Sequence, residues 1–256
     1  MRQKKTAAFW AAILAGFTIL CFAASAFAAP GAPSADEQRA SRLKAALEKK
    51  FAPEWMEVSL EGGPDEKGFV QKASVRAKGA VIDKLRVDSL VMEASDIQFN
   101  EPEDWDRKLK VRNAGLTKSR GVILERDINA AMVKSLSRDR KWKSISMDLS
   151  PQRIKAVGVY ETHFLFTLRF LVKLTGILAA SPDGKQIYIR DYKINVSGMT
   201  MPQGLAEDVI EKVQPIIDFR ESVFPVSVKK IVMDDDSISF VSDPPPSGEP
   251  APVKGP

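Results

Sequence analysis

The sequence predicts an α+β protein built on an elongated, strongly curved antiparallel sheet, tubular and lipid-binding-like, with two or three packed helices. Three observations lead to this fold class. Residues 56–124 are dominated by apolar residues at a period of two, and residues 163–174 follow the same pattern. Helical spacing is confined to residues 34–51, 125–136 and 202–217. Long strands that follow one another with few helices between them favour a coiled, curved sheet.

Residues 1–28 are predicted to be a secretory signal peptide. Three basic residues lie among the first five, and residues 7–24 form an apolar run without a charge. Ala26-Phe27-Ala28 is a small-x-small cleavage signal, so we expect cleavage after Ala28. The alternative is an uncleaved anchor, because about 18 apolar residues could span a bilayer. Either reading places the protein outside the cytoplasm, in the periplasm or cell envelope.

The charge balance gives no support to nucleic-acid binding. The net charge of +5 includes three bases of residues 1–28, so the remainder is close to neutral. Cys21, the single cysteine, lies within that segment. The exported chain is therefore expected to fold without a disulfide, by its own apolar core.

The predicted organisation places one β-rich domain between two short flanking regions. Residues 29–54 are a linker and an N-terminal helix, in which Ser34 and Glu37 form a capping box and Pro53 ends the pattern. Residues 55–242 form the lipid-binding-like domain, and residues 243–256 form a proline-rich tail that is expected to be disordered.

Within the domain, the strands are predicted in three runs, separated by the helices at residues 125–136 and 202–217. The phase of Val70 differs from that of Ala73, which suggests a bulge. Ile194 keeps the phase of Ile189 only if a bulge or twist separates them. Pro215 should kink or end the helix predicted at residues 202–217. The predicted strands are residues 56–61, 69–78, 85–99, 109–124, 142–149, 153–159, 163–174, 185–196, 226–233 and 237–241, with turns at 62–65 and 182–184.

The segment 163–174 is the most informative part of the chain, because its even positions from 164 are all apolar and three are Phe. Such a face must be covered, either by the protein's own side chains or by a long apolar ligand. The pattern alone does not separate the two. The candidate lipid-binding residues are Phe164, Phe166, Leu168, Phe170, Val172 and Leu174, with Ile187, Ile189, Ile194 and Val196 on the returning strand.

The order and spacing of several segments resemble the LmeA-like phospholipid-binding family of exported bacterial proteins. The matching blocks are residues 58–64, 73–79, 85–92, 123–132, Met201-Pro202, 216–219 and 224–226. The resemblance implies a periplasmic or cell-envelope protein with an elongated β-rich body that binds phospholipid.

Catalytic and metal-binding signals are weak. After residue 28 the chain has no cysteine, and its one histidine, His163, has no G-x-S-x-G motif nearby. Asp234-Asp235-Asp236 lacks the spacing of a calcium loop and is interpreted as a solvated turn. We therefore expect no catalytic residues, no metal, no cofactor and no enzymatic activity. The densest basic cluster, a candidate for headgroup or membrane contact, is Arg138, Arg140, Lys141, Trp142 and Lys143.

Two functions remain open from the sequence. The first is non-catalytic binding or carriage of phospholipid, with the acyl chains in an apolar groove of a curved sheet and a possible contact with the membrane surface. The second is a structural or adaptor module of the envelope, whose aromatic face is ordinary core and which has no ligand cavity. Protein partners are not specified by the sequence.

Overall fold

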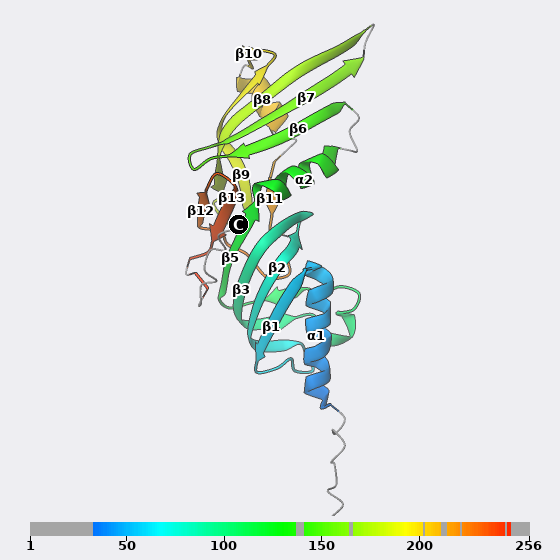
Figure 1. The fold of residues 1–256 in the computed structure, drawn as a ribbon. Coiled ribbons are helices and arrows are strands. Elements are labelled where there is room, and N and C mark those ends of the chain that lie inside the picture. The colour runs from blue at the N-terminus through cyan, green and yellow to red at the C-terminus, as the bar shows by residue number, and fades with distance from the viewer. Residues whose placement is uncertain are drawn as a thin grey trace, which may run out of the picture. The chain divides into compact units, whose positions relative to one another are not determined.

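The computed structural model describes residues 33–136, 141–163, 166–201, 203–210, 214–220, 222–243 and 245–246. The predicted signal peptide lies outside the described residues, as does most of the tail. The described chain forms two antiparallel sheets with helices packed on them (Figure 1). The β-rich, antiparallel character predicted from the sequence is confirmed.

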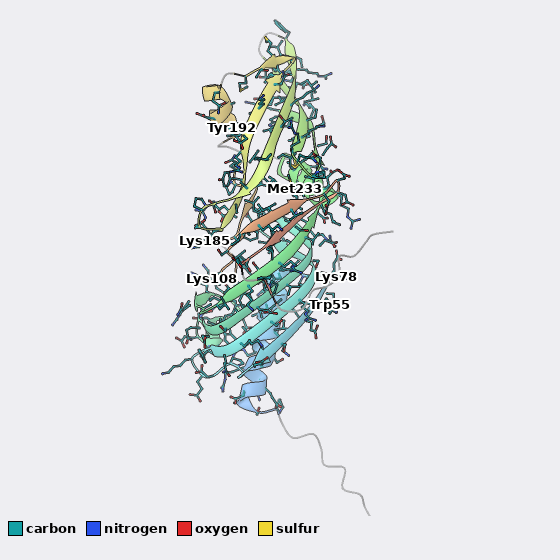
Figure 2. The ribbon with its side chains drawn as sticks, turned by 90° about the vertical axis from the view of Figure 1, so that its left-hand side faces the viewer. Trp55, Lys78, Lys108, Lys185, Tyr192 and Met233 are labelled. Carbon is teal, nitrogen blue, oxygen red and sulfur yellow. The ribbon has the colours of Figure 1, made fainter. Side chains whose placement is uncertain are left out.

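The first sheet has the strand order β1-β2-β3-β5-β13-β12, and β4 pairs with β3. Its β1 edge carries Trp55, which pairs with Lys78 of β2 (Figure 2). Strand β3 has the predicted bounds, whereas the predicted strand at 109–124 is interrupted. The elements of this half are α1 (Ala35–Phe51), β1 (Trp55–Glu61), β2 (Phe69–Ile82), β3 (Leu85–Phe99), the 3-10 helix η1 (Pro102–Asp104), β4 (Val111–Asn113), β5 (Thr117–Leu124), β12 (Lys230–Met233) and β13 (Ser237–Val241).

The second sheet has the order β10-β9-β8-β7-β6, and β11 pairs with β9. Helix α2 links the two sheets and contacts strands of both. The elements of this half are α2 (Glu125–Leu136), β6 (Trp142–Leu149), β7 (Ile154–His163), β8 (Thr167–Ala180), β9 (Gln186–Val196), β10 (Met199–Thr200), α3 (Gln203–Ile210) and β11 (Ile217–Asp218).

The prediction of one extended sheet is wrong. After β5 the chain enters α2 and then builds the second sheet, and only the final hairpin returns to pair β13 with β5. The described strand orders end at β1 and β12 in one sheet and at β10 and β6 in the other, so both are open. A strongly curved or tubular sheet is therefore not shown along these strands.

The bulge predicted near Val70 is also wrong, although the change of phase is real. Val70 and Ala73 are both buried, and Gln71 and Lys72 between them are exposed. The register between β2 and β3 does not shift across this point. Instead Asp96, which lies opposite Gln71, adopts a left-handed φ of 50°, and the pairing resumes in the same register on either side of these two residues.

The phase change expected in the returning strand is confirmed as a bulge. Thr175 pairs with Lys193 and Ile177 pairs with Arg190, so two residues of β9 face one of β8. The two residues are Asp191, with a left-handed φ of 48°, and Tyr192, which Figure 2 labels.

The helices follow their predicted signals in two of three cases. Helix α1 begins after the predicted capping box of Ser34 and Glu37, and it buries Leu43, Leu47 and Phe51. Helix α2 has the predicted bounds. Helix α3 is described from Gln203 to Ile210, and the predicted end at residue 217 is wrong, because Ile216 donates a backbone hydrogen bond to Ile187 of β9 (2.9 Å) and Ile217 lies in β11 (Ile217–Asp218).

Candidate functional site

A cavity of about 540 Å³ lies between α2 and the second sheet. This volume is within the range of roughly 300–1,000 Å³ that is typical of small-molecule sites. Three of its lining residues are charged, and the rest are apolar. The lining residues are Asp83, Lys84, Leu85, Ile128, Ala131, Met132, Lys134, Trp142, Ile145, Met147, Ala156, Val157, Gly158, Val172, Leu174, Ile189, Ile194, Pro215 and Ile216.

Helix α2 is held over the cavity by polar contacts with the edge strand β6. The side-chain amide of Asn129 donates to the carbonyl of Met147 (2.9 Å) and accepts from its N–H (2.7 Å). One turn earlier, the carboxylate of Glu125 accepts from the N–H of Leu149 (2.7 Å). These side chains satisfy the outer backbone groups of β6, which ends the strand order of the second sheet among the described residues.

Helix α2 turns an apolar stripe of side chains toward the cavity. Ile128, Ala131 and Met132 lie at i, i+3 and i+4 and all line it, and Ile128 is 3 % exposed. The helix at residues 125–136 is predicted from the sequence, but none of its residues is among the predicted lipid-binding residues. The i, i+3, i+4 spacing of these apolar residues is the sequence feature that could have placed them in the site.

On the sheet side, an aromatic ring lies over a glycine. A Cβ placed on Gly158 would be 2.7 Å from the ring of Trp142, so only glycine leaves room for the ring there. The ring also makes an edge-to-face contact with Tyr160, with 5.3 Å between the ring centroids.

The predicted aromatic strand contributes to the cavity through only part of its length. Alternation holds in β8, whose even positions from Leu168 to Leu174 are half-buried while the odd ones up to Lys173 are exposed. Val172 and Leu174 line the cavity. Leu168 and Phe170 continue the same face away from it, where Phe170 pairs with Tyr160. Phe166 is 65 % exposed, and Phe164 lies outside the described residues.

Of the four predicted lipid-binding residues on β9, two line the cavity and two do not. Ile189 and Ile194 line the cavity and are buried. Ile187 is fully buried in the main apolar core, between β8 and β11, and does not line it. Val196 is half-buried beside Val172 and extends the apolar face beyond the cavity.

The predicted basic cluster does not act as one surface. Arg138 and Arg140 lie outside the described residues, and Lys141 is exposed. Trp142 lines the cavity. The ammonium of Lys143 contacts the carboxylate of Glu161 (3.1 Å).

Glu161 lies on the face of the second sheet opposite the cavity, where it contacts Lys143 and Arg169. Its carboxylate accepts from the guanidinium of Arg169 (2.7 Å) and also lies 3.7 Å from the imidazole of His163. Hydrogen bonds from Arg169 and Lys143 lower the pKa of Glu161. The carboxylate therefore stays ionised and holds these bases in place, which leaves Lys143 less available to a ligand.

Beside the cavity, an ion-pair network ties β3 to α2. The guanidinium of Arg86 contacts carboxylates of Glu54 (2.9 Å), Asp127 (2.9 Å) and Asp88 (3.2 Å). Burial alone lowers the pKa of Arg86, but the hydrogen bonds to these carboxylates outweigh it and raise the pKa above its ordinary value. The network fixes α2 relative to the turn that supplies Lys84 and Leu85 to the cavity.

The described residues contain no group of three or more His, Cys, Asp or Glu side chains that could hold a metal ion. Within the same residues, none of the helices has the length and apolar character needed to cross a membrane. Comparisons with family models, curated proteins and solved structures return no match. The site is an apolar cavity whose lining includes three charged residues, Asp83, Lys84 and Lys134.

Proposed function

We propose that this protein binds phospholipid non-catalytically in the cell envelope, with an acyl chain in the cavity between α2 and the second sheet. The observation that carries the proposal is the apolar lining of a cavity of about 540 Å³, in which only Asp83, Lys84 and Lys134 are charged. Burying each CH₂ group of a chain is worth about 0.8 kcal/mol. Such binding needs no reactive side chain.

The surroundings of the cavity support a ligand longer than the cavity itself. The apolar face of the second sheet continues from Val172 through Phe170 and Leu168, which are half-buried. Near the ends of these strands, Phe166 is 65 % and Met199 is 74 % exposed. Exposed apolar side chains of this kind suit contact with a membrane. In this proposal the second sheet covers one side of the acyl chain and α2 covers the other, and the phospholipid ligand is the one that the LmeA-like resemblance implies.

Native mass spectrometry of protein incubated with vesicles of phosphatidylethanolamine and phosphatidylglycerol tests the proposal. We expect the protein to retain one lipid. Ala131→Trp places an indole in the cavity and should abolish retention. Val133→Trp, at a position that is 58 % exposed on the same helix, is the matched control and should retain lipid. Absence of lipid from the unaltered protein would contradict the proposal and favour the adaptor function. Equal retention by both variants would show that lipid binds elsewhere.

A further inference from the structure

A second hollow, of about 460 Å³, lies at the other end of β3 from the cavity. Leu85, which lines the cavity, opens β3, and Phe99, whose ring contacts Trp105 of the hollow, closes it. At about 3.3 Å per residue, the two ends are roughly 45 Å apart. The hollow is bounded by the end of α1, by residues 105–111 and by Arg220, Ser222 and Val223.

The lining of this hollow is strongly basic. Six of its residues are Lys or Arg, and Asp106 is its single acid. Lys49 and Lys50 lie in the last turn of α1, where the helix dipole favours positive charge. Lys108 and Lys110 are not in a helix, so a helix dipole does not explain why positive charge is placed there.

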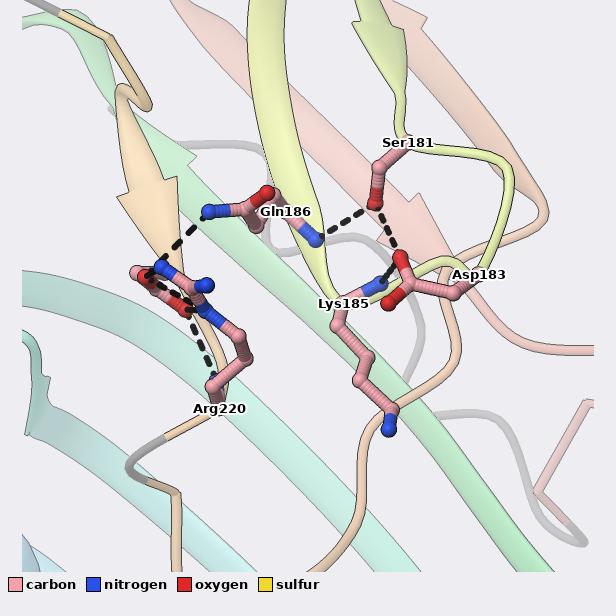
Figure 3. Close-up of polar contacts among 6 residues, drawn as sticks. Ser181, Asp183, Lys185, Gln186 and Arg220 are labelled. Atoms are coloured by element: carbon pink, nitrogen blue, oxygen red, sulfur yellow. Dashed lines mark hydrogen bonds and ion pairs between the residues drawn. The ribbon is translucent and has the colours of Figure 1, made fainter.

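Part of the charge is neutralised inside the protein and part is not. Arg220 is paired with Asp218, with 2.9 Å between Nε and a carboxylate oxygen (Figure 3), and the pKa of Asp218 falls to about 2 because of this hydrogen bond. Arg107 is paired with Asp104 (2.5 Å). Among the residues that the structure describes, no carboxylate pairs with Lys50, Lys108 or Lys110. All three are exposed, and Figure 2 labels Lys108.

The loop that carries Lys108 and Lys110 is fixed by a buried amide. Asn100 is 9 % exposed, and its side chain donates to the carbonyl of Lys108 (2.8 Å) and accepts from the N–H of Lys110 (2.9 Å). The indole N–H of Trp105 donates to the Asn100 carbonyl (2.7 Å). The two lysines therefore extend from a backbone that is already ordered, which lowers the entropic cost of binding.

The lining of the hollow also contains a buried hydroxyl. Ser222 lines the hollow, and its Oγ is buried without a hydrogen-bond partner in the described structure. Buried polar groups without a partner are rare and require an explanation. Because this Oγ is covered in the unbound protein, it would donate to a bound oxyanion once the Ser222 side chain rotates toward the hollow.

We propose that this hollow binds a phosphate group. Several ammonium groups and one hydroxyl donor around a fixed loop match the charge and the acceptor oxygens of phosphate. The phosphate could belong to a lipid headgroup at a membrane surface or to a soluble phosphate compound. This site is separate from the acyl-chain cavity and does not depend on it.

Calorimetric titration of the full chain with glycerol 1-phosphate and with inorganic phosphate tests the proposal. We expect binding that weakens as salt is raised. The double variant K108Q/K110Q should lower the affinity at least tenfold. K229Q/K230Q removes the same charge from two exposed lysines on and beside β12 and should leave the affinity unchanged. An equal loss of phosphate affinity in both double variants would overturn the proposal, because the affinity would then depend on the net charge of the protein and not on this hollow.

Ser222→Ala separates a built site from a diffuse basic patch. We expect a loss of about three- to tenfold in phosphate affinity, as for one lost hydrogen bond, without a fall in Tm, because the hydroxyl has no partner in the protein to lose. Unchanged affinity would contradict the assignment of Ser222.

Co-sedimentation with vesicles distinguishes the two sources. If the source is a headgroup, phosphatidylglycerol vesicles should retain the protein, and K108Q/K110Q should release it. If the source is soluble, glycerol 1-phosphate binds while vesicle binding is insensitive to that variant. If neither soluble probe nor vesicle responds to K108Q/K110Q, the proposal is wrong. The Ala131→Trp variant should behave as the unaltered protein here, so failure of this site and failure of the lipid cavity are distinguishable.

Discussion

The side chain of Asn129 and the backbone of Met147 exchange two hydrogen bonds, of 2.9 and 2.7 Å. The amide thus takes the place of a neighbouring strand at the edge of β6. Together with the hydrogen bond from the Leu149 N–H to Glu125, this pair docks α2 onto the second sheet beside the cavity.

Asn129→Ala should therefore destabilise the protein. It leaves a partly buried carbonyl and N–H of Met147 without partners, which costs about 1–3 kcal/mol. Urea unfolding followed by circular dichroism measures the change. Asn113→Ala, at an exposed position of β4, is the control and should change the free energy of unfolding by less than about 0.5 kcal/mol. Similar values for the two variants would show that the Asn129 contact does not hold α2.

Gly158→Ala should displace the ring of Trp142. The new Cβ would lie 2.7 Å from a ring atom, closer than such atoms approach, so the ring must move within the cavity. We expect a loss of about 1–3 kcal/mol, as for an overpacked site, and an altered Trp142 fluorescence, obtained by subtracting the spectrum of a Trp142→Phe protein. Gly63→Ala has open space around its Cβ and is the control. An unchanged Trp142 signal in Gly158→Ala would contradict the close contact.

Acid should weaken the protein partly through Asp218. The hydrogen bond from Arg220 is the largest cause of the fall in its pKa from 3.8 to about 2. A carboxylate whose pKa is lowered by folding stabilises the protein above its unfolded pKa, and this contribution disappears as the pH falls from about 4 to about 2. Asp218→Asn should lower Tm at pH 6 and flatten its decline in that window. Asp235→Asn, on an exposed turn, should leave the profile unchanged. A profile for Asp218→Asn that matches the unaltered protein would contradict this assignment.

Arg86→Gln should loosen α2 from the first sheet. The substitution leaves the carboxylate of Asp127, which is 12 % exposed, without its cation. Because Arg86 itself is partly solvated, we expect a loss of about 1–3 kcal/mol, below the value for a fully buried pair. Hydrogen exchange should rise along residues 125–134. Arg126→Gln alters a guanidinium that is 74 % exposed and should do neither. Unchanged exchange in α2 would contradict the proposed role of the network.

The sequence predicted local structure well where the signal was local. The Ser34–Glu37 capping box, the bounds of α2 and β3, and the bulge before Ile194 are all confirmed, because each depends on neighbouring residues. The division into two sheets was missed, since the pairing of β13 with β5 joins residues more than a hundred positions apart. Periodicity carries no information about such partners.

The candidate site was predicted only in part for a related reason. Alternation in β8 identified the correct face, and Val172 and Leu174 lie in the cavity. The alternation carries no information about how far α2 extends over that face. Phe170 and Leu168 were therefore predicted in the same site, although they do not line the cavity. Ile187 has the same pattern as Ile189 but is core, because β11 packs beside it. A core face and a ligand-lining face have the same composition, and only the tertiary neighbours distinguish them.

The most direct measurement of the central claim is photo-crosslinking with a phosphatidylglycerol that carries a diazirine near the end of one acyl chain. After irradiation, digestion and mass spectrometry map the modified residues. The proposal predicts labels on residues 128–132 of α2 and on 172–174 of β8, and their loss in Ala131→Trp but not in Val133→Trp. Labels confined to exposed residues such as Phe166 and Met199, or equal labelling in both variants, would contradict an acyl chain inside the cavity.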